Sequence, residues 1–174
     1  MRCVFTVLFV SVLLVQAPKV NDADEPSEIP LRKAGLWEVQ TTTDEGRGTQ
    51  NQTLTMCIGG EMERSTVLAS IRENRSSCSK YEIRKTAEGT TVDAVCVYDE
   101  RQVTNHTELR GDFTTGFEVK VVSATTGNAP RAQGGMPVNV SRMIVQKGRY
   151  LGESCGELHA GEAKTAAGQT VTVQ

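Results

Sequence analysis

The chain has 174 residues, which suits one domain with a modest hydrophobic core. Its formal net charge is only -2 at pH 7, so the composition argues against nucleic-acid binding and against an acidic disordered chain. Aromatic residues make up 5% of the chain, whereas threonine, valine and glycine are frequent, which favours strands and turns over helices.

The first residues have the pattern of a secretory signal peptide. Arg2 is the only charge ahead of an apolar run that ends at Val15 and is short for a membrane span. A core segment rarely stands at the extreme start of a chain behind a single arginine. A proline follows Ala17 and would hinder cleavage there, so Ala23 is a second candidate site. We predict a signal peptide over residues 1–23, a periplasmic or secreted protein, and no stable membrane span in the mature chain.

A polar lead-in and a β-hairpin follow. Residues 24–33 are charged and proline-bearing, which indicates a flexible lead-in to a single domain over residues 34–157. The first expected strand is Gly35–Thr43, and the face that carries Trp37, the only tryptophan, is its natural core face. A glycine-bearing turn leads to a second strand at Gln50–Ile58, which completes a hairpin.

The rest of the domain alternates strands and turns after one helix. Apolar residues recur near helical spacing over about Glu61–Glu73, which predicts a short helix between the second and third strands. Thr125–Pro137 is an expected mobile loop, and residues 158–174 an expected disordered tail. About seven strands in sequential hairpins predict a mainly β antiparallel meander, either curled into a barrel or half-barrel or packed by one face on the helix. The five later strands are Lys80–Thr86, Thr91–Tyr98, Gln102–Asp112, Phe117–Ala124 and Val138–Leu151.

Four cysteines remain after the signal peptide: Cys57, Cys78, Cys96 and Cys155. An even number in an oxidising compartment predicts two disulfides, and no pair has the Cys-x-x-Cys spacing of a redox or zinc site. Four cysteines allow three connectivities, which the sequence does not resolve. We favour Cys57–Cys78, which would close a loop around the helix, with Cys96–Cys155 tying a middle strand to the end of the domain.

Five segments in order carry a family resemblance: Ala34–Val39, Thr53–Cys57, Ser77–Tyr81, Thr91–Cys96 and Gly148–Cys155. Over about residues 31–156 the chain resembles the bacterial secreted domain-of-unknown-function 3617 family. The resemblance implies a signal peptide and a β-rich domain, and it implies no particular activity. The Met-rich central stretch usual in that family is thin here, since only Met136 remains before Pro137.

No constellation in the sequence points to catalysis, a metal or a cofactor. There are only two histidines, His106 and His159, which are few for a metal site. A nucleophile elbow, paired glycosidase carboxylates and a phosphate-binding loop are all missing from the sequence. Four glycosylation sequons are present, at Asn51, Asn74, Asn105 and Asn139. Because the resemblance is to a bacterial family, we expect that they arise by chance from the Thr-rich composition and carry no glycans.

Three functional hypotheses remain open. The first is a non-catalytic envelope domain that binds a ligand or a partner protein, with Trp37 either as core anchor or as the lining of a ligand cavity. The second is a periplasmic hydrolase around His106 and Glu108, which requires His106 in a polar concave pocket rather than on an open convex face. The third is an interaction module that uses the loop at 125–137 or an edge strand.

Overall fold

The computed structural model describes residues 28–98, 101–128 and 137–173. Its helix α1 spans Gly60–Ser77, so it begins near the predicted start and continues four residues beyond the predicted end. The strands are β1 Gly35–Asp44, β2 Thr49–Ile58, β3 Cys78–Lys85, β4 Thr90–Tyr98, β5 Arg101–Gly111, β6 Gly116–Asn128, β7 Pro137–Gly152, β8 Glu162–Thr165 and β9 Thr170–Thr172.

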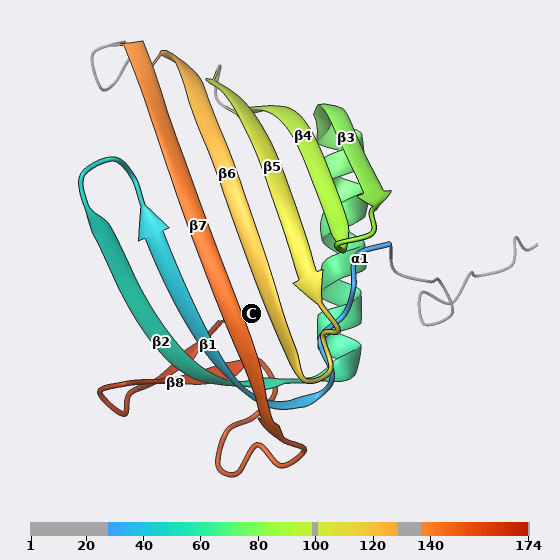
Figure 1. Ribbon diagram of the computed structural model, residues 1–174, viewed down its shortest axis with the longest axis vertical. Coiled ribbons are helices and arrows are strands. Elements are labelled where there is room, and N and C mark those ends of the chain that lie inside the picture. The colour runs from blue at the N-terminus through green and yellow to red at the C-terminus, as the bar shows by residue number, and fades with distance from the viewer. Residues whose placement is uncertain (1–27, 99–100, 129–136, 174) are drawn as a thin grey trace, which may run out of the picture.

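The nine strands form one antiparallel sheet in the order β3-β4-β5-β6-β7-β1-β2-β8-β9. Strands β3 and β9 are its two edges, so within the described residues the sheet stays open (Figure 1). The helix lies behind β3 and β4 in this view, at one end of the sheet. The mainly β antiparallel fold with one helix is therefore confirmed, with nine strands in place of seven. The described helix is not long and apolar enough to cross a membrane.

The two faces of the sheet differ, and we call the face that carries Trp37 and α1 the inner face and the opposite one the outer face. The Trp37 side chain is 0% exposed, and its ring lies 5.4 Å from the ring of Phe117 and 5.3 Å from that of Tyr150. Its indole N–H donates a 2.8 Å hydrogen bond to the carbonyl of Lys33, which satisfies the buried polar group. Trp37 is thus the core anchor of β1.

The described part of the lead-in is packed, so the predicted flexible segment at 24–33 is wrong for residues 28–33. The Arg32 guanidinium donates to both carboxylate oxygens of Glu63 on α1, at 2.8 and 2.6 Å. Glu63 is buried, and Arg32 pairs it in the bidentate geometry that suits a buried carboxylate. The main-chain N–H of Lys33 donates to the carbonyl of Phe113. The polar composition of residues 24–33 suggested a flexible segment. The prediction failed because the carboxylate that pairs with Arg32 lies far away in the sequence, at Glu63.

The disulfides are Cys57–Cys155, with Cα atoms 5.4 Å apart, and Cys78–Cys96, with Cα atoms 4.1 Å apart. Two disulfides were predicted correctly, but the favoured pairing was wrong. Helix α1 runs directly into β3, and the β3–β4 hairpin places Cys78 opposite Cys96. Cys57, near the end of β2, therefore bonds to Cys155 and anchors the segment that follows β7.

The predicted disordered tail at 158–174 is also wrong for its described part, because residues 162–172 add β8 and β9 to the sheet. Ala163 is fully buried opposite Met56, where the core has room for a small side chain. A composition rich in Gly, Ala and Thr suggested disorder, whereas the small side chain of Ala163 is in fact fully buried against β2.

Two further predictions fall on parts of the chain outside the described residues. The signal peptide at 1–23 lies entirely there, and residues 129–136 of the expected loop do as well. At the two ends of that loop, β6 continues to Asn128 and β7 begins at Pro137, so the pairing of these strands is longer than predicted.

The β5–β6 turn is held by one carboxylate. Asp112 accepts hydrogen bonds from the main-chain N–H groups of Thr114, Thr115 and Gly116 at 2.8, 2.7 and 3.2 Å, and from the Thr115 hydroxyl at 2.7 Å. The turn gives Phe113 a φ of 58° and directs its ring into the core, stacked on another phenylalanine ring. These hydrogen bonds, those of Thr115 first, hold the pKa of Asp112 well below its usual range.

We expect the Asp112 turn to make the domain sensitive to acid. In the unfolded chain the pKa of an aspartate carboxyl is about 3.9, and in the folded domain the pKa of Asp112 is lower. The stabilisation from the ionised carboxylate is therefore fully present above the unfolded pKa, and it is lost progressively as the pH falls toward the folded pKa. The free energy of unfolding, measured from pH 6 down to pH 3, should fall less steeply for Asp112→Asn than for the wild type. Glu88→Gln, in an exposed turn, is the control; equal slopes for all three proteins would contradict the assignment.

Candidate functional site

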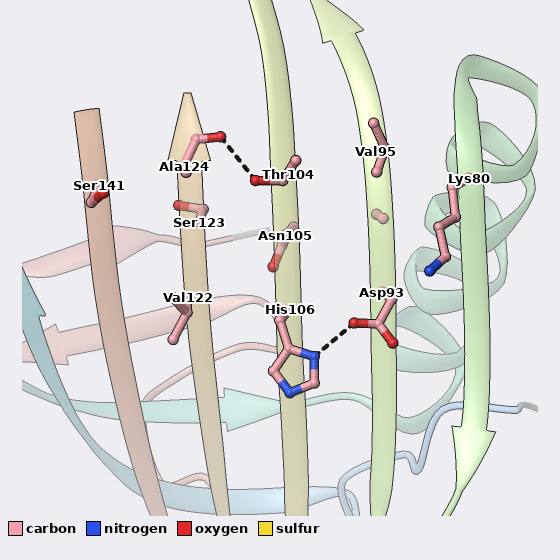
Figure 2. A pocket seen from close by; sticks show the side chains of 11 residues that line it. Lys80, Asp93, Val95, Thr104, Asn105, His106, Val122, Ser123, Ala124 and Ser141 are labelled. Carbon is pink, nitrogen blue, oxygen red and sulfur yellow. Dashed lines mark hydrogen bonds and ion pairs between the residues drawn. The ribbon is translucent and has the colours of Figure 1, made fainter. Parts of the chain in front are cut away.

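The first candidate site is a shallow hollow on the outer face of β3–β7, centred on His106 (Figure 2). The Nδ1 atom of His106 lies 2.7 Å from Oδ1 of Asp93, its cross-strand neighbour on β4. Its Nε2 atom lies 3.5 Å from a carboxylate oxygen of Glu108. The hydrogen bond from His106, and to a smaller extent the charge of Arg84, lower the pKa of Asp93.

This cluster lies on the open side of the sheet. In Figure 2 the helix lies behind the strand that carries Lys80, on the far side of the sheet, and the His106 side chain is 45% exposed. Arg84 forms ion pairs with Asp93 and Glu82, so the carboxylates are matched by cations in a solvated cross-strand network. The Thr104 hydroxyl in the same hollow donates to the carbonyl of Ala124. The hollow is open to solvent, and it places an exposed histidine beside the Asp93 carboxylate, which is itself paired with a cation.

The second candidate site is a groove of about 210 Å³ on the inner face, between α1 and β3–β5. Its apolar wall includes Tyr81, Val92, Val103 and Leu109, which come from three neighbouring strands. Burial raises the pKa of the Tyr81 hydroxyl and keeps it neutral, and neighbouring charges modulate this shift. The groove is therefore an apolar cleft without a buried ionised side chain among these residues.

The lining of the groove also includes polar side chains. Asn74 of α1 donates from Nδ2 to the carbonyl of Ser70 at 2.8 Å, and the Thr107 hydroxyl donates to Oδ1 of Asn105 at 3.2 Å. Space for the groove comes from Ala94, whose cross-strand neighbours on the two sides are Tyr81 and Asn105. A few polar groups in an apolar cleft are typical of small-molecule sites.

The structure brings together only some of the residues singled out in the sequence. His106 and Glu108 meet as suggested, but Asp93, the closest partner of His106, was missed, although the register of the expected hairpin could have found it. Trp37 is a core residue and is not among the residues that line either site. Of the four sequons, Asn51 and Asn139 are exposed, whereas Asn74 and Asn105 line the groove. Among the described residues no group of three His, Cys, Asp or Glu side chains is arranged to hold a metal ion.

Comparison with known proteins identifies a family without assigning an activity. No curated protein and no solved structure matches the chain. The family model described as "Protein of unknown function (DUF3617)" matches residues 32–155, which include both disulfides and all strands from β1 to β7. The chain therefore belongs to the DUF3617 family of proteins of unknown function.

Proposed function

We propose that the chain is an exported, non-catalytic binding protein of the cell envelope, and that its ligand site is the groove between α1 and β3–β5. The observation that carries the proposal is the groove itself, an apolar cleft beside the helix whose lining includes the polar side chains of Asn74, Asn105 and Thr107. Export is supported by two disulfides, which are typical of oxidising compartments, and by the signal-peptide pattern at residues 1–23.

The size of the groove sets the kind of ligand. A volume of about 210 Å³ is smaller than the about 300–1,000 Å³ of sites that enclose a drug-sized molecule, so the groove accommodates part of a ligand, such as one apolar chain. Asn74, Asn105 and Thr107 offer neutral donors and acceptors that would orient a polar end. A non-catalytic role is supported by the position of His106, which lines the outer hollow and not this groove.

The proposal predicts that a charge in the groove abolishes binding of an apolar probe. Val103→Asp places a carboxylate in the apolar wall, where it would be desolvated by the ligand, so affinity for the neutral fluorophore N-phenyl-1-naphthylamine should fall about tenfold or more. Val97→Asp is the matched control. Val97 lies on β4, next to the β5 strand of Val103, and its side chain is 61% exposed on the outer face of the sheet. Melting curves verify that both variants fold. Equal affinities for the wild type and Val103→Asp would reject the groove as the site.

A further inference from the structure

A stretch of free sheet edge runs along the first half of β2. Strand β8 pairs with β2 only at Leu54–Met56, and no other described strand lies beyond β2 at Thr49–Thr53. In Figure 1, β2 forms the left border of the sheet, with β8 at its lower end only. All five side chains from Thr49 to Thr53 are exposed. The main-chain N–H and C=O groups of such an edge are a template for another strand.

This edge lacks the features by which proteins usually block strand pairing. Strand β3, at one end of the sheet, carries Lys80, Arg84 and Lys85, and β9, at the other end, has three residues. Charges and short length both protect edges. By contrast, Thr49–Thr53 has no charge and no proline, and it pairs with β1 in a regular register without a bulge. It is thus a neutral and regularly paired edge without these protective features.

The sequence of the edge identifies the partner. Thr49–Thr53 reads Thr-Gln-Asn-Gln-Thr, which is the same in both directions. A two-fold axis through Asn51 would place Asn51 opposite Asn51 of a second copy, Gln50 opposite Gln52, and Thr49 opposite Thr53. Amide side chains carry both donors and acceptors, so Asn–Asn and Gln–Gln pairs satisfy each other, and Thr–Thr pairs are favourable across strands. The edge is complementary to itself.

The limits of the free edge fit this register. At one end, Leu54 is already paired with Thr165 of β8. At the other end, Gly48 has a φ of 121° and the strand begins only at Thr49, so the chain leaves the sheet there. With Thr53 opposite Thr49 of the second copy, the five paired positions end where β8 begins, and neither copy competes with the β8 of the other.

We propose that the chain forms a symmetric dimer in which the Thr49–Thr53 edges of two copies pair antiparallel and join their sheets. The contact involves five residues per copy in the strands, compared with about 20–30 residues a side in a standard interface. The dimer should therefore dissociate on dilution. The dimer does not depend on the ligand-binding role proposed above.

The test is sedimentation equilibrium of the purified chain over a concentration series. The wild type should show a monomer–dimer equilibrium. Gln50→Lys/Gln52→Lys sets lysine against lysine across the axis and should be monomeric at every concentration, as should Gln50→Glu/Gln52→Glu. An equimolar mixture of these two variants should recover a dimer, because lysine then faces glutamate. Recovery on mixing excludes misfolding as the cause of the losses.

The control is Glu82→Lys on the β3 edge, which should dimerise like the wild type. A wild type that stays monomeric throughout would overturn the proposal, whether or not it binds an extended peptide at this edge. So would a lysine variant that still dimerises, since the contact would then lie elsewhere, or a mixture of the two variants that stays monomeric.

Discussion

Removing the Cys57–Cys155 disulfide should destabilise the domain by about 4–5 kcal/mol, and removing Cys78–Cys96 by about 3 kcal/mol. The first joins residues 98 apart in the sequence and the second residues 18 apart, so the longer crosslink restricts the unfolded chain more. In addition, Cys57–Cys155 fixes the start of the segment that carries β8, and the carbonyl of Cys57 accepts a 3.0 Å hydrogen bond from Gly161. Loss of the long crosslink should therefore also loosen β8 and β9.

The comparison uses Cys57→Ser/Cys155→Ser and Cys78→Ser/Cys96→Ser as double variants, so that no free thiol remains to exchange. Guanidinium unfolding followed by the fluorescence of Trp37, the single and fully buried tryptophan, gives the free energy of unfolding. Hydrogen exchange at Ala163 should increase in the first variant and stay close to the wild type in the second. A larger loss from removing Cys78–Cys96 would contradict the loop-closure argument.

The strands from β1 to β7 and the hairpins that join them were predictable because each hairpin carries its own alternation and turn, whereas the pairing of β1 with β7 was not predicted. The β3–β4 turn at about residues 87–89 also sets which cysteines of this hairpin lie near each other. Regular pairing through Lys80 and Val95 places Ser79 opposite Cys96, and the register shift between Cys78 and Lys80 brings Cys78 there instead. Extending the regular hairpin register would have brought Cys78 to within one residue of the position opposite Cys96, which favours Cys78–Cys96 over the pairing based on loop closure.

Other features depend on contacts between distant segments, which alternation does not report. The buried pair of Arg32 and Glu63 joins positions 31 apart, and each residue looks like an ordinary surface charge in its own segment. Ala163 is buried because β8 joins β2, far along the chain. The inner groove likewise results from the way α1 covers β3 and β4, so the sequence showed an alternating strand around Ala94 but no cleft.

A single methyl group at Gly148 should destabilise the fold by about 3 kcal/mol or more. Gly148 on β7 faces Phe117 on β6, and a Cβ atom there would lie 2.0 Å from Cε1 and 2.4 Å from Cζ of the ring. The ring cannot simply move aside, because it is stacked on Phe113 and packed against Trp37 with ring centroids 5.3 and 5.4 Å away. The backbone of Gly148 does not have a positive φ, so a clash rather than backbone strain is the expected cause.

Gly152→Ala is the matched control on the same strand, because a Cβ atom there would meet nothing within 4 Å. Its free energy of unfolding should stay within about 0.5 kcal/mol of the wild type. Phe117→Leu shortens the side chain that Gly148→Ala would strike, so the double variant should lose less stability than the two single losses added together. Strict additivity would mean that the methyl group acts through something other than the ring, since two residues that compete for one space must show a favourable coupling.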